Sequence, residues 1–217
     1  LFKKNKVTLL KGYGAFVGQA DGLTQVKVTD KDGVEQIVSA KNVIIATGSK
    51  ARHLPNITVD QTMIADNEGA LSFTEVPKKL GVIGAGVIGL ELGSVWRRLG
   101  SEVTVLEAMP SFLAAADGAV AKEAKKLFEK QGLKFELGVS IGEVKTAKKG
   151  VSIAYKDAAG ADQTLDCDKL VVSVGRVPNT DNLNLEAVGV KTNERGFIEV
   201  NHDCATATGG IWAIGDV

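Results

Sequence analysis

Cysteine and histidine are scarce in this chain, with two of each among 217 residues. Cys167 and Cys204 lie 37 positions apart and form no CxxC pair, which argues against a disulfide scaffold, a dithiol redox motif and a structural zinc site. We interpret both as ordinary core or surface thiols. His53 and His202 have no partners at metal-ligand spacing, so we assign no catalytic or metal-binding role to either.

An excess of one charge and long apolar runs are also missing. The 26 basic and 26 acidic residues balance, which gives no electrostatic reason to expect nucleic acid or an anionic membrane as a partner. No apolar run approaches the roughly 20 residues that span a bilayer. The first ten residues are basic and then apolar, but they lack the long apolar core of a signal peptide. We expect a soluble, cytoplasmic protein.

The first 50 residues favour strands. After a basic segment that is typical of a helix end, residues 7–12, 24–30 and 35–40 alternate or run apolar, with Gly-containing turn signals between them. A fully apolar strand is predicted over residues 42–46, followed by Thr47-Gly48-Ser49. Residues 51–79 are expected to connect this part to the next.

From Leu80 the pattern changes to alternating strands and helices. The sequence predicts strands at 80–84, 102–107 and 133–137, and helices at 87–99 and 117–131 that end at Gly100 and Gly132. This βαβαβ order implies a parallel sheet with right-handed crossovers. Three further strands (151–155, 163–168 and 169–175) are typical of a β-meander that closes one edge, and 196–200 and 210–216 indicate two more strands.

A glycine motif directly follows the strand at 80–84 and opens the first helix. Gly84, Gly86 and Gly89 form a G-x-G-x-x-G: the first permits a tight turn, the second lets the main chain approach a diphosphate, and the third lets helix and strand pack closely. The helix N-terminus then offers free N–H groups to the phosphates. Glu107 ends the next strand, 18 residues beyond Gly89, where a carboxylate can accept hydrogen bonds from both ribose hydroxyls.

Glu107 also distinguishes between two cofactors. A carboxylate repels a 2′-phosphate, whose binders normally supply arginine at this place, and residues 107–117 contain no Arg or Lys. The sequence therefore predicts NAD(H) rather than NADP(H). Glu91, two residues past the last glycine, is open to two interpretations: a nicotinamide-site residue, or a carboxylate that complements the helix dipole.

Four motifs in a fixed order carry a family resemblance. IIATGS (44–49), GAGVIGLELG (84–93), VGRVPNT (174–180) and IWAIGDV (211–217) resemble the two-dinucleotide flavoprotein disulfide reductases, and the resemblance covers the whole chain. Residues 87–107 look most like the members that oxidise dihydrolipoamide. The glutathione-reductase-like members carry Tyr at position 87 and arginines after the second strand, and this chain has neither.

The resemblance implies an α/β, Rossmann-like FAD/NAD(P)-binding fold: a complete NAD domain at 50–176 with a parallel sheet and a β-meander, and partial FAD-domain segments at 1–49 and 177–217. It assigns roles only at matching positions, and it places Arg176 near the join of the domains. The positions assigned to FAD are Gly14, Thr47, Gly48, Ser49 and Asp216. Those assigned to NAD are Gly84, Ala85, Gly86, Val87, Ile88, Gly89, Leu90, Glu91, Glu107, Ile141 and Gly175.

The departures from the family pattern limit what the chain could do alone. The family's first FAD-binding glycine motif, its redox C-x4-C and its His–Glu acid/base pair match nothing here, so no catalytic residue is assigned. We expect an internal piece of a protein about twice as long, inactive in disulfide reduction by itself. The resemblance implies that the parent passes electrons from dihydrolipoamide to NAD⁺ through FAD.

Partners and alternatives follow from the same resemblance. The parent would meet the lipoyl domains of 2-oxoacid dehydrogenase complexes, act as a homodimer and contribute to cell redox homeostasis. Two alternatives stay open: a flavin-dependent reductase of another substrate, such as a different disulfide, a peroxide or mercuric ion, or an NAD-binding module without turnover.

Overall fold

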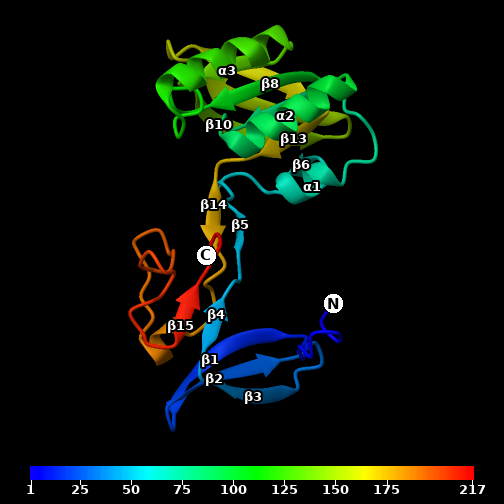
Figure 1. Ribbon diagram of the computed structural model, residues 1–217. Helices are drawn as coiled ribbons and strands as arrows, with labels where there is room; N and C mark the ends of the chain where they lie inside the picture. Colours follow the sequence, from blue (N-terminus) through cyan, green and yellow to red (C-terminus); the bar gives the residue numbers. More distant parts are fainter. The chain divides into compact units, whose positions relative to one another are not determined.

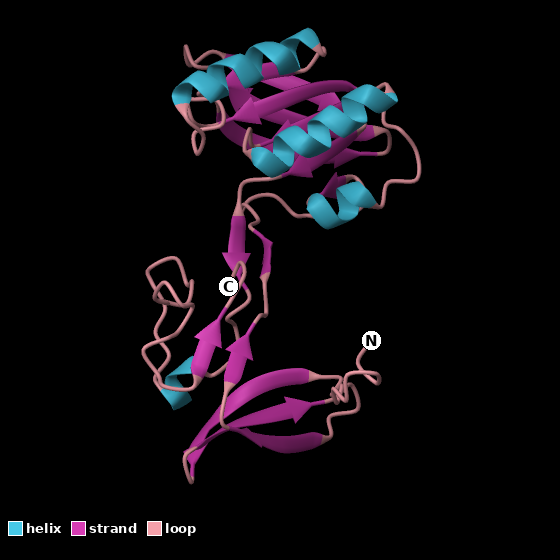
Figure 2. Ribbon diagram, viewed as in Figure 1, coloured by secondary structure: helices cyan, strands magenta, loops and turns pink.

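The computed structural model describes residues 1–217, which fall into two compact units (Figures 1 and 2). Unit 1 comprises residues 1–50 and 177–217, and unit 2 comprises residues 51–176. The chain passes from one unit to the other along β5 (Ser49–Ala51) and β14 (Arg176–Pro178), which pair as a two-stranded sheet.

Unit 2 is built on a five-stranded parallel sheet with the order β6-β13-β7-β8-β9. Its strands are β6 (Ile64–Ala65), β13 (Lys169–Val172), β7 (Lys79–Ile83), β8 (Glu102–Glu107) and β9 (Lys134–Leu137). From β7 the chain proceeds outward through β8 and β9, and it later returns to lay β13 on the other side of β7. The order of the strands therefore reverses beside β7, which is where open α/β sheets leave a crevice for ligands.

The two faces of this sheet bury different partners, because successive side chains of a strand point to opposite faces. On one face Leu80 and Val82 join Val103, Val105 and side chains of two helices in one core cluster. On the other face a second cluster contains Ile83, Leu106, Leu170 and Val172, packed against Val151, Ile153 and Cys167 of an antiparallel meander.

Both long helices cover the first of these faces. α2 (Val87–Leu99) buries Leu90, Leu92 and Trp96, and it ends at Gly100, whose φ of 115° gives the left-handed conformation of a helix C-cap. α3 (Gly118–Lys130) starts from the N-cap Asp117, whose carboxylate accepts from the amides of Ala119 and Val120. Each has 13 residues, and none of the helices combines the length and apolarity that crossing a membrane requires.

The meander on the second face consists of β10 (Ser140–Ala147), β11 (Gly150–Lys156) and β12 (Asp162–Cys167). The sequence correctly predicted the last two strands but missed β10, whose side chains are mostly exposed and form no apolar run. It also grouped residues 169–175 with the meander. That grouping was wrong: β13 is buried on both faces and pairs in parallel with β6 and β7.

Unit 1 contains an antiparallel sheet of β1 (Tyr13–Ala20), β2 (Leu23–Thr29) and β3 (Glu35–Ala40). A parallel pair is formed by β4 (Val43–Ile45) and β15 (Ile211–Ala213), and a 3-10 helix, η1 (Leu185–Val188), packs on β1. The core of unit 1 is the cluster of Phe16, Ile45, Leu185, Val188, Val190, Ile198, Ile211, Ala213 and Val217.

Other elements also differ from the sequence predictions, and the eight-residue strand β1 was missed. Residues 2–6 form turns instead of a helix end, residues 7–11 are not a strand, and the predicted strand at 196–200 is reduced to a single bridge between Thr192 and Ile198. The segment expected only to connect, 51–79, holds β6 and the short helix α1 (Asn67–Leu71). The sequence did not reveal β6 and α1 because both are short: two residues show no strand alternation, and five residues give too few turns for a helical period.

Burial of Leu170 yields a stability prediction. This side chain is fully buried in the second core cluster, so Leu170→Ala is expected to lower the free energy of unfolding by about 2–5 kcal/mol. Leu127→Ala on the exposed side of α3 is the matched control and should cost about 1 kcal/mol or less. Urea unfolding followed by Trp96 fluorescence, in a Trp212→Phe background, reports on unit 2 alone. Equal losses for the two variants would contradict this account of the core.

Candidate nucleotide-binding site

A cavity of about 750 Å³ opens at the carboxyl ends of β7, β8 and β13, beside the point where the strand order reverses. All of its lining residues belong to unit 2. They are Leu54, Asn56, Ile83, Gly84, Ala85, Gly86, Glu107, Ala108, Met109, Ser111, Ala114, Ala115, Val139, Ser140, Ile141, Ser173, Val174 and Gly175. A mostly apolar cleft with a few polar groups at such an edge is the form that cofactor sites take.

The three glycines of the motif meet different surroundings. Gly84 has a φ of 109°, and a Cβ there would lie 2.2 Å from the Ser173 carbonyl oxygen. A Cβ at Gly89 would lie 2.1 Å from the carbonyl oxygen of Gly84. A Cβ at Gly86 would meet nothing within 4 Å. Packing within the protein therefore requires the first and third glycines, whereas the second leaves open space at the cavity.

No side chain caps the N-terminus of α2, in contrast to the other two α-helices. Asp66 caps α1 and Asp117 caps α3 through their carboxylates, but the N-cap of α2 is Gly86, which has no side chain to bind the amides of the first turn. The first N–H groups of a helix have no acceptor within the helix and carry a partial positive charge. Together they make an anion-binding position at the cavity.

Glu107 lies beside this turn, at the end of β8. Its Oε2 accepts a hydrogen bond of 2.7 Å from the Ala85 amide, and its Oε1 accepts one of 2.8 Å from the Met109 amide. The side chain is only partly buried. A carboxylate has about four lone-pair positions, so two remain for hydroxyl groups of a ligand.

The structure brings together some of the residues predicted for NAD. Gly84, Ala85, Gly86, Glu107, Ile141 and Gly175 all line the cavity. The remaining predicted residues, all on α2, are not among its lining residues. Gly89 and Leu90 are buried, Ile88 is half-buried against the helix-side core, and Val87 and Glu91 are exposed.

Sequence reasoning missed most of the other lining residues, and two groups of them follow strands of the sheet. Ser173 and Val174 follow β13, and assigning this strand to the meander concealed that its carboxyl end reaches the same edge as those of β7 and β8. Met109, Ser111, Ala114 and Ala115 follow β8, but small and flexible side chains in a loop carry no recognisable pattern. Only the first group had a usable signal, namely the fully apolar run of residues 170–172.

In unit 1, two of the positions assigned to FAD are in direct contact. The Ser49 hydroxyl donates to Asp216 Oδ2 at 2.6 Å. Asn179 forms hydrogen bonds with Thr47 and Gly48. Thr47 Oγ1 donates to the Asn179 carbonyl oxygen at 2.8 Å, and the Asn179 backbone amide donates to the Gly48 carbonyl oxygen at 2.8 Å. Gly14 lies on β1 and, with Thr47, lines an apolar cavity of about 180 Å³.

His53 has a structural partner. Its Nε2 lies 3.0 Å from Oδ2 of the buried Asp66 carboxylate. Burial alone would raise the pKa of Asp66, but hydrogen bonds from His53, Gln61 and backbone amides outweigh it and hold this pKa below its usual value. His53 thus helps to satisfy the N-cap of α1, while His202 is exposed in a turn.

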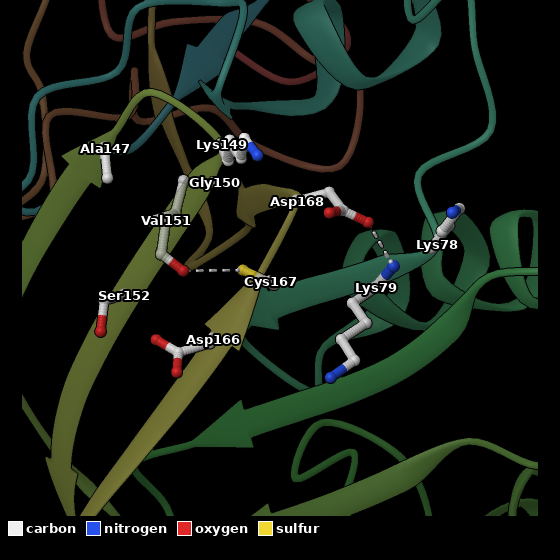
Figure 3. A pocket seen from close by; sticks show the side chains of 10 residues that line it. All are labelled: Lys78, Lys79, Ala147, Lys149, Gly150, Val151, Ser152, Asp166, Cys167 and Asp168. Atoms are coloured by element: carbon white, nitrogen blue, oxygen red, sulfur yellow. Dashed lines mark hydrogen bonds between the residues drawn. The ribbon is translucent and has the colours of Figure 1, made fainter.

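A second cavity of unit 2 lies at the opposite, amino-terminal ends of β7 and β13 (Figure 3). Its lining includes Cys167, whose Sγ lies 3.6 Å from the Val151 carbonyl oxygen. Burial raises the pKa of the Cys167 thiol to about 11. A thiol that stays protonated is a poor nucleophile, so this cysteine is unsuited to disulfide exchange.

The surroundings of Gly89 and Gly86 predict different effects of alanine substitution on the free energy of unfolding. Gly89→Ala should lower the free energy of unfolding of unit 2 by about 1–3 kcal/mol, because the clash with the Gly84 carbonyl outweighs the gain of about 1 kcal/mol in helix propensity. Gly86→Ala should change it by no more than about 0.5 kcal/mol. Urea unfolding followed by Trp96 fluorescence measures both, and a stable Gly89→Ala variant would refute the packing argument.

The raised pKa of Cys167 predicts slow alkylation of the folded chain. At pH 8 a thiol with a pKa of about 11 is ionised in roughly one molecule in a thousand. Cys167 should therefore stay unmodified by iodoacetamide when native and react readily in urea, as followed by peptide mass spectrometry. Equal rates in the two conditions would show that the thiol is neither buried nor protonated.

Curated proteins similar in sequence match all of the chain. Dihydrolipoyl dehydrogenase of Cupriavidus necator is 66% identical over 217 residues, which are 45% of that protein. Leghemoglobin reductase of Vigna unguiculata is 48% identical, and mitochondrial dihydrolipoyl dehydrogenase of Pisum sativum is 45% identical, with 41% and 43% of their lengths covered. The chain therefore spans less than half the length of these relatives.

Solved structures match over nearly the same range. LpdA of Mycobacterium tuberculosis has a TM-score of 0.87 at 26% identity, covering 99% of this chain and 46% of that one. The flavoprotein disulfide reductase RclA of Escherichia coli, as a Cu(II) complex, has a TM-score of 0.85 at 27% identity, covering 100% and 47%. The family model of pyridine nucleotide-disulphide oxidoreductases matches residues 1–217. With the glycine turn, the uncapped helix end and the acidic residue beside them in place, the chain belongs to the pyridine nucleotide-disulphide oxidoreductase family.

Proposed function

We propose that this chain is the nucleotide-binding part of a dihydrolipoyl dehydrogenase. In this proposal unit 2 binds NAD(H), and unit 1 contributes to the FAD site. The 66% identity to the Cupriavidus necator dihydrolipoyl dehydrogenase over the full chain supports the parent activity, which is the oxidation of dihydrolipoamide to lipoamide with reduction of NAD⁺. When both cofactors are bound, they supply hydride transfer between flavin and nicotinamide.

One observation carries the assignment of NAD to unit 2. The uncapped N-terminus of α2, the open space at Gly86 and the carboxylate of Glu107 meet in one cavity of about 750 Å³. A diphosphate fits the amides, because they offer unsatisfied donors and the positive end of the helix dipole. The adjoining adenosine ribose fits Glu107, and half-buried Ile141 offers an apolar surface for the adenine.

Electrostatics favours NAD over NADP at this site. Two like unit charges 4 Å apart repel by about 1 kcal/mol in water and by about 4 kcal/mol at an effective dielectric constant of 20. A 2′-phosphate would meet Glu107 without a compensating cation, since residues 107–117 contain neither Arg nor Lys. The expected discrimination is therefore tenfold or more.

For FAD we propose Gly14, Thr47, Gly48, Ser49 and Asp216 as the contributing residues of unit 1. Thr47, Ser49 and Asp216 are polar groups at the ends of β4 and β15. Asp216 would accept from a hydroxyl of the ribityl chain, and the Ser49 hydroxyl orients that carboxylate. The dithiol step is assigned to parts of the longer relatives that this chain does not span, and we expect no disulfide reduction from these residues alone.

A related reductase is the alternative function. Leghemoglobin reductase, at 48% identity, and RclA, at 27%, carry names that indicate other activities in the same family. Assays of the full-length protein with dihydrolipoamide and with other disulfides distinguish them. Lipoyl domains as partners, a homodimeric parent and a cytoplasmic location stay predictions from the resemblance.

The test of the proposed site is cofactor binding to this chain. NADH should bind at least about tenfold more tightly than NADPH in isothermal titration calorimetry, because only NADPH places a phosphate against Glu107. Gly86→Ala should weaken NADH binding at least about tenfold while leaving stability unchanged, since its methyl group occupies the open space that the diphosphate needs.

Gly118→Ala is the matched control, because Gly118 also starts a helix and has open space around it but lies outside the cavity. It should leave both affinities unchanged. Equal or tighter binding of NADPH would refute the choice of cofactor. Unchanged NADH affinity in Gly86→Ala would show that the nucleotide binds elsewhere.

A further inference from the structure

Glu107 makes contacts that ribose recognition does not require. Its two carboxylate oxygens accept from two backbone amides, those of Ala85 and Met109, at 2.7 and 2.8 Å. Hydrogen bonds to carboxylates in this range are stronger than those between neutral groups. One of the amides lies within the glycine turn, and the other lies in the loop after β8, so a single side chain joins two walls of the cavity.

We infer that Glu107 is a positioning residue that holds the glycine turn in its diphosphate-receiving conformation before the nucleotide arrives. The inference rests on the proposed function, and it gives Glu107 a second role that does not depend on the ribose. Ala85 is 1% exposed, and Glu107 supplies the acceptor for its amide. Without the carboxylate this amide would be buried and unsatisfied, which favours a rearranged turn.

The neighbouring backbone shows why this one side chain matters. The Gly84 amide donates to the Leu106 carbonyl at 2.8 Å, which continues the β7–β8 pairing up to the first residue of the turn. The backbone hydrogen bonds between the β7 and β8 segments end at Gly84, and the next hydrogen bond between these segments runs from the Ala85 amide to the Glu107 side chain. The Met109 carbonyl in turn accepts from the Gly138 amide at 3.0 Å, so the link extends to the segment after β9.

Glutamine at position 107 separates the two tasks of the carboxylate. It keeps the size of the side chain but offers one acceptor oxygen, and its NH₂ group would face one of the two amide donors. One of the amides would then lose its acceptor. If Glu107 served only the ribose hydroxyls, Glu107→Gln would leave the affinity for a nucleotide without those hydroxyls unchanged.

The experiment compares ADP with 2′,3′-dideoxy-ADP by calorimetry, using wild-type chain and Glu107→Gln. Positioning predicts that the variant loses affinity for both ligands, by at least about fivefold for the dideoxy compound. Glu102→Gln is the matched control on the same strand, since Glu102 is exposed at the far end of β8, and it should change neither affinity. Loss confined to ADP would overturn the inference while leaving the proposed function intact.

Hydrogen exchange provides a second readout that needs no ligand. Amides of residues 84–89 should exchange faster in Glu107→Gln than in wild type, by about fivefold or more, while those of α3 keep their rates. Unchanged exchange at 84–89 would overturn the inference. Because this measurement is made on the free chain, it decides the inference even if neither nucleotide binds to wild type, a result that would refute the proposed function instead.

Discussion

The close contact between the start of α2 and the end of β7 is the constraint on which the rest of the site depends. Gly89 lies so near the Gly84 carbonyl that any side chain would collide with it, and Gly84 itself lies against the Ser173 carbonyl at the end of β13. This packing brings the first turn of α2 to the carboxyl edge of the sheet. With no capping side chain at Gly86, the helix presents its free amides to the cavity.

The architecture of unit 2 supplies the remaining walls of the site. A parallel sheet needs both faces covered, and this one uses α2 and α3 on one face and an antiparallel meander on the other. The meander also returns the chain to the sheet, so that β13 lies next to β7 although 89 residues separate Leu170 from its partner Gly81. Ser173, Val174 and Gly175 reach the cavity only because of that return.

The distribution of polar groups agrees with a division of labour within a longer enzyme. The cavity at the carboxyl ends of β7, β8 and β13 collects amides, one carboxylate and apolar surface, which are suited to binding a nucleotide. Cys167 is buried with a raised pKa, and His53 is engaged in the capping of α1. The relatives in sequence are more than twice as long as this chain. Under the proposed function, this chain would contribute the placement of the cofactors.

Local sequence patterns predicted the elements whose pattern lies within a few consecutive residues. The span of α2, the glycine turn and the strand ending at Glu107 could all be predicted, because glycine spacing and helical period act over a few residues. Tertiary structure alone decided that β13 enters the parallel sheet, that Ser173 and Met109 line the same cavity, and that Glu107 accepts from the Ala85 amide. These features join residues far apart in the chain, and their geometry depends on which strands pair, which no local pattern encodes.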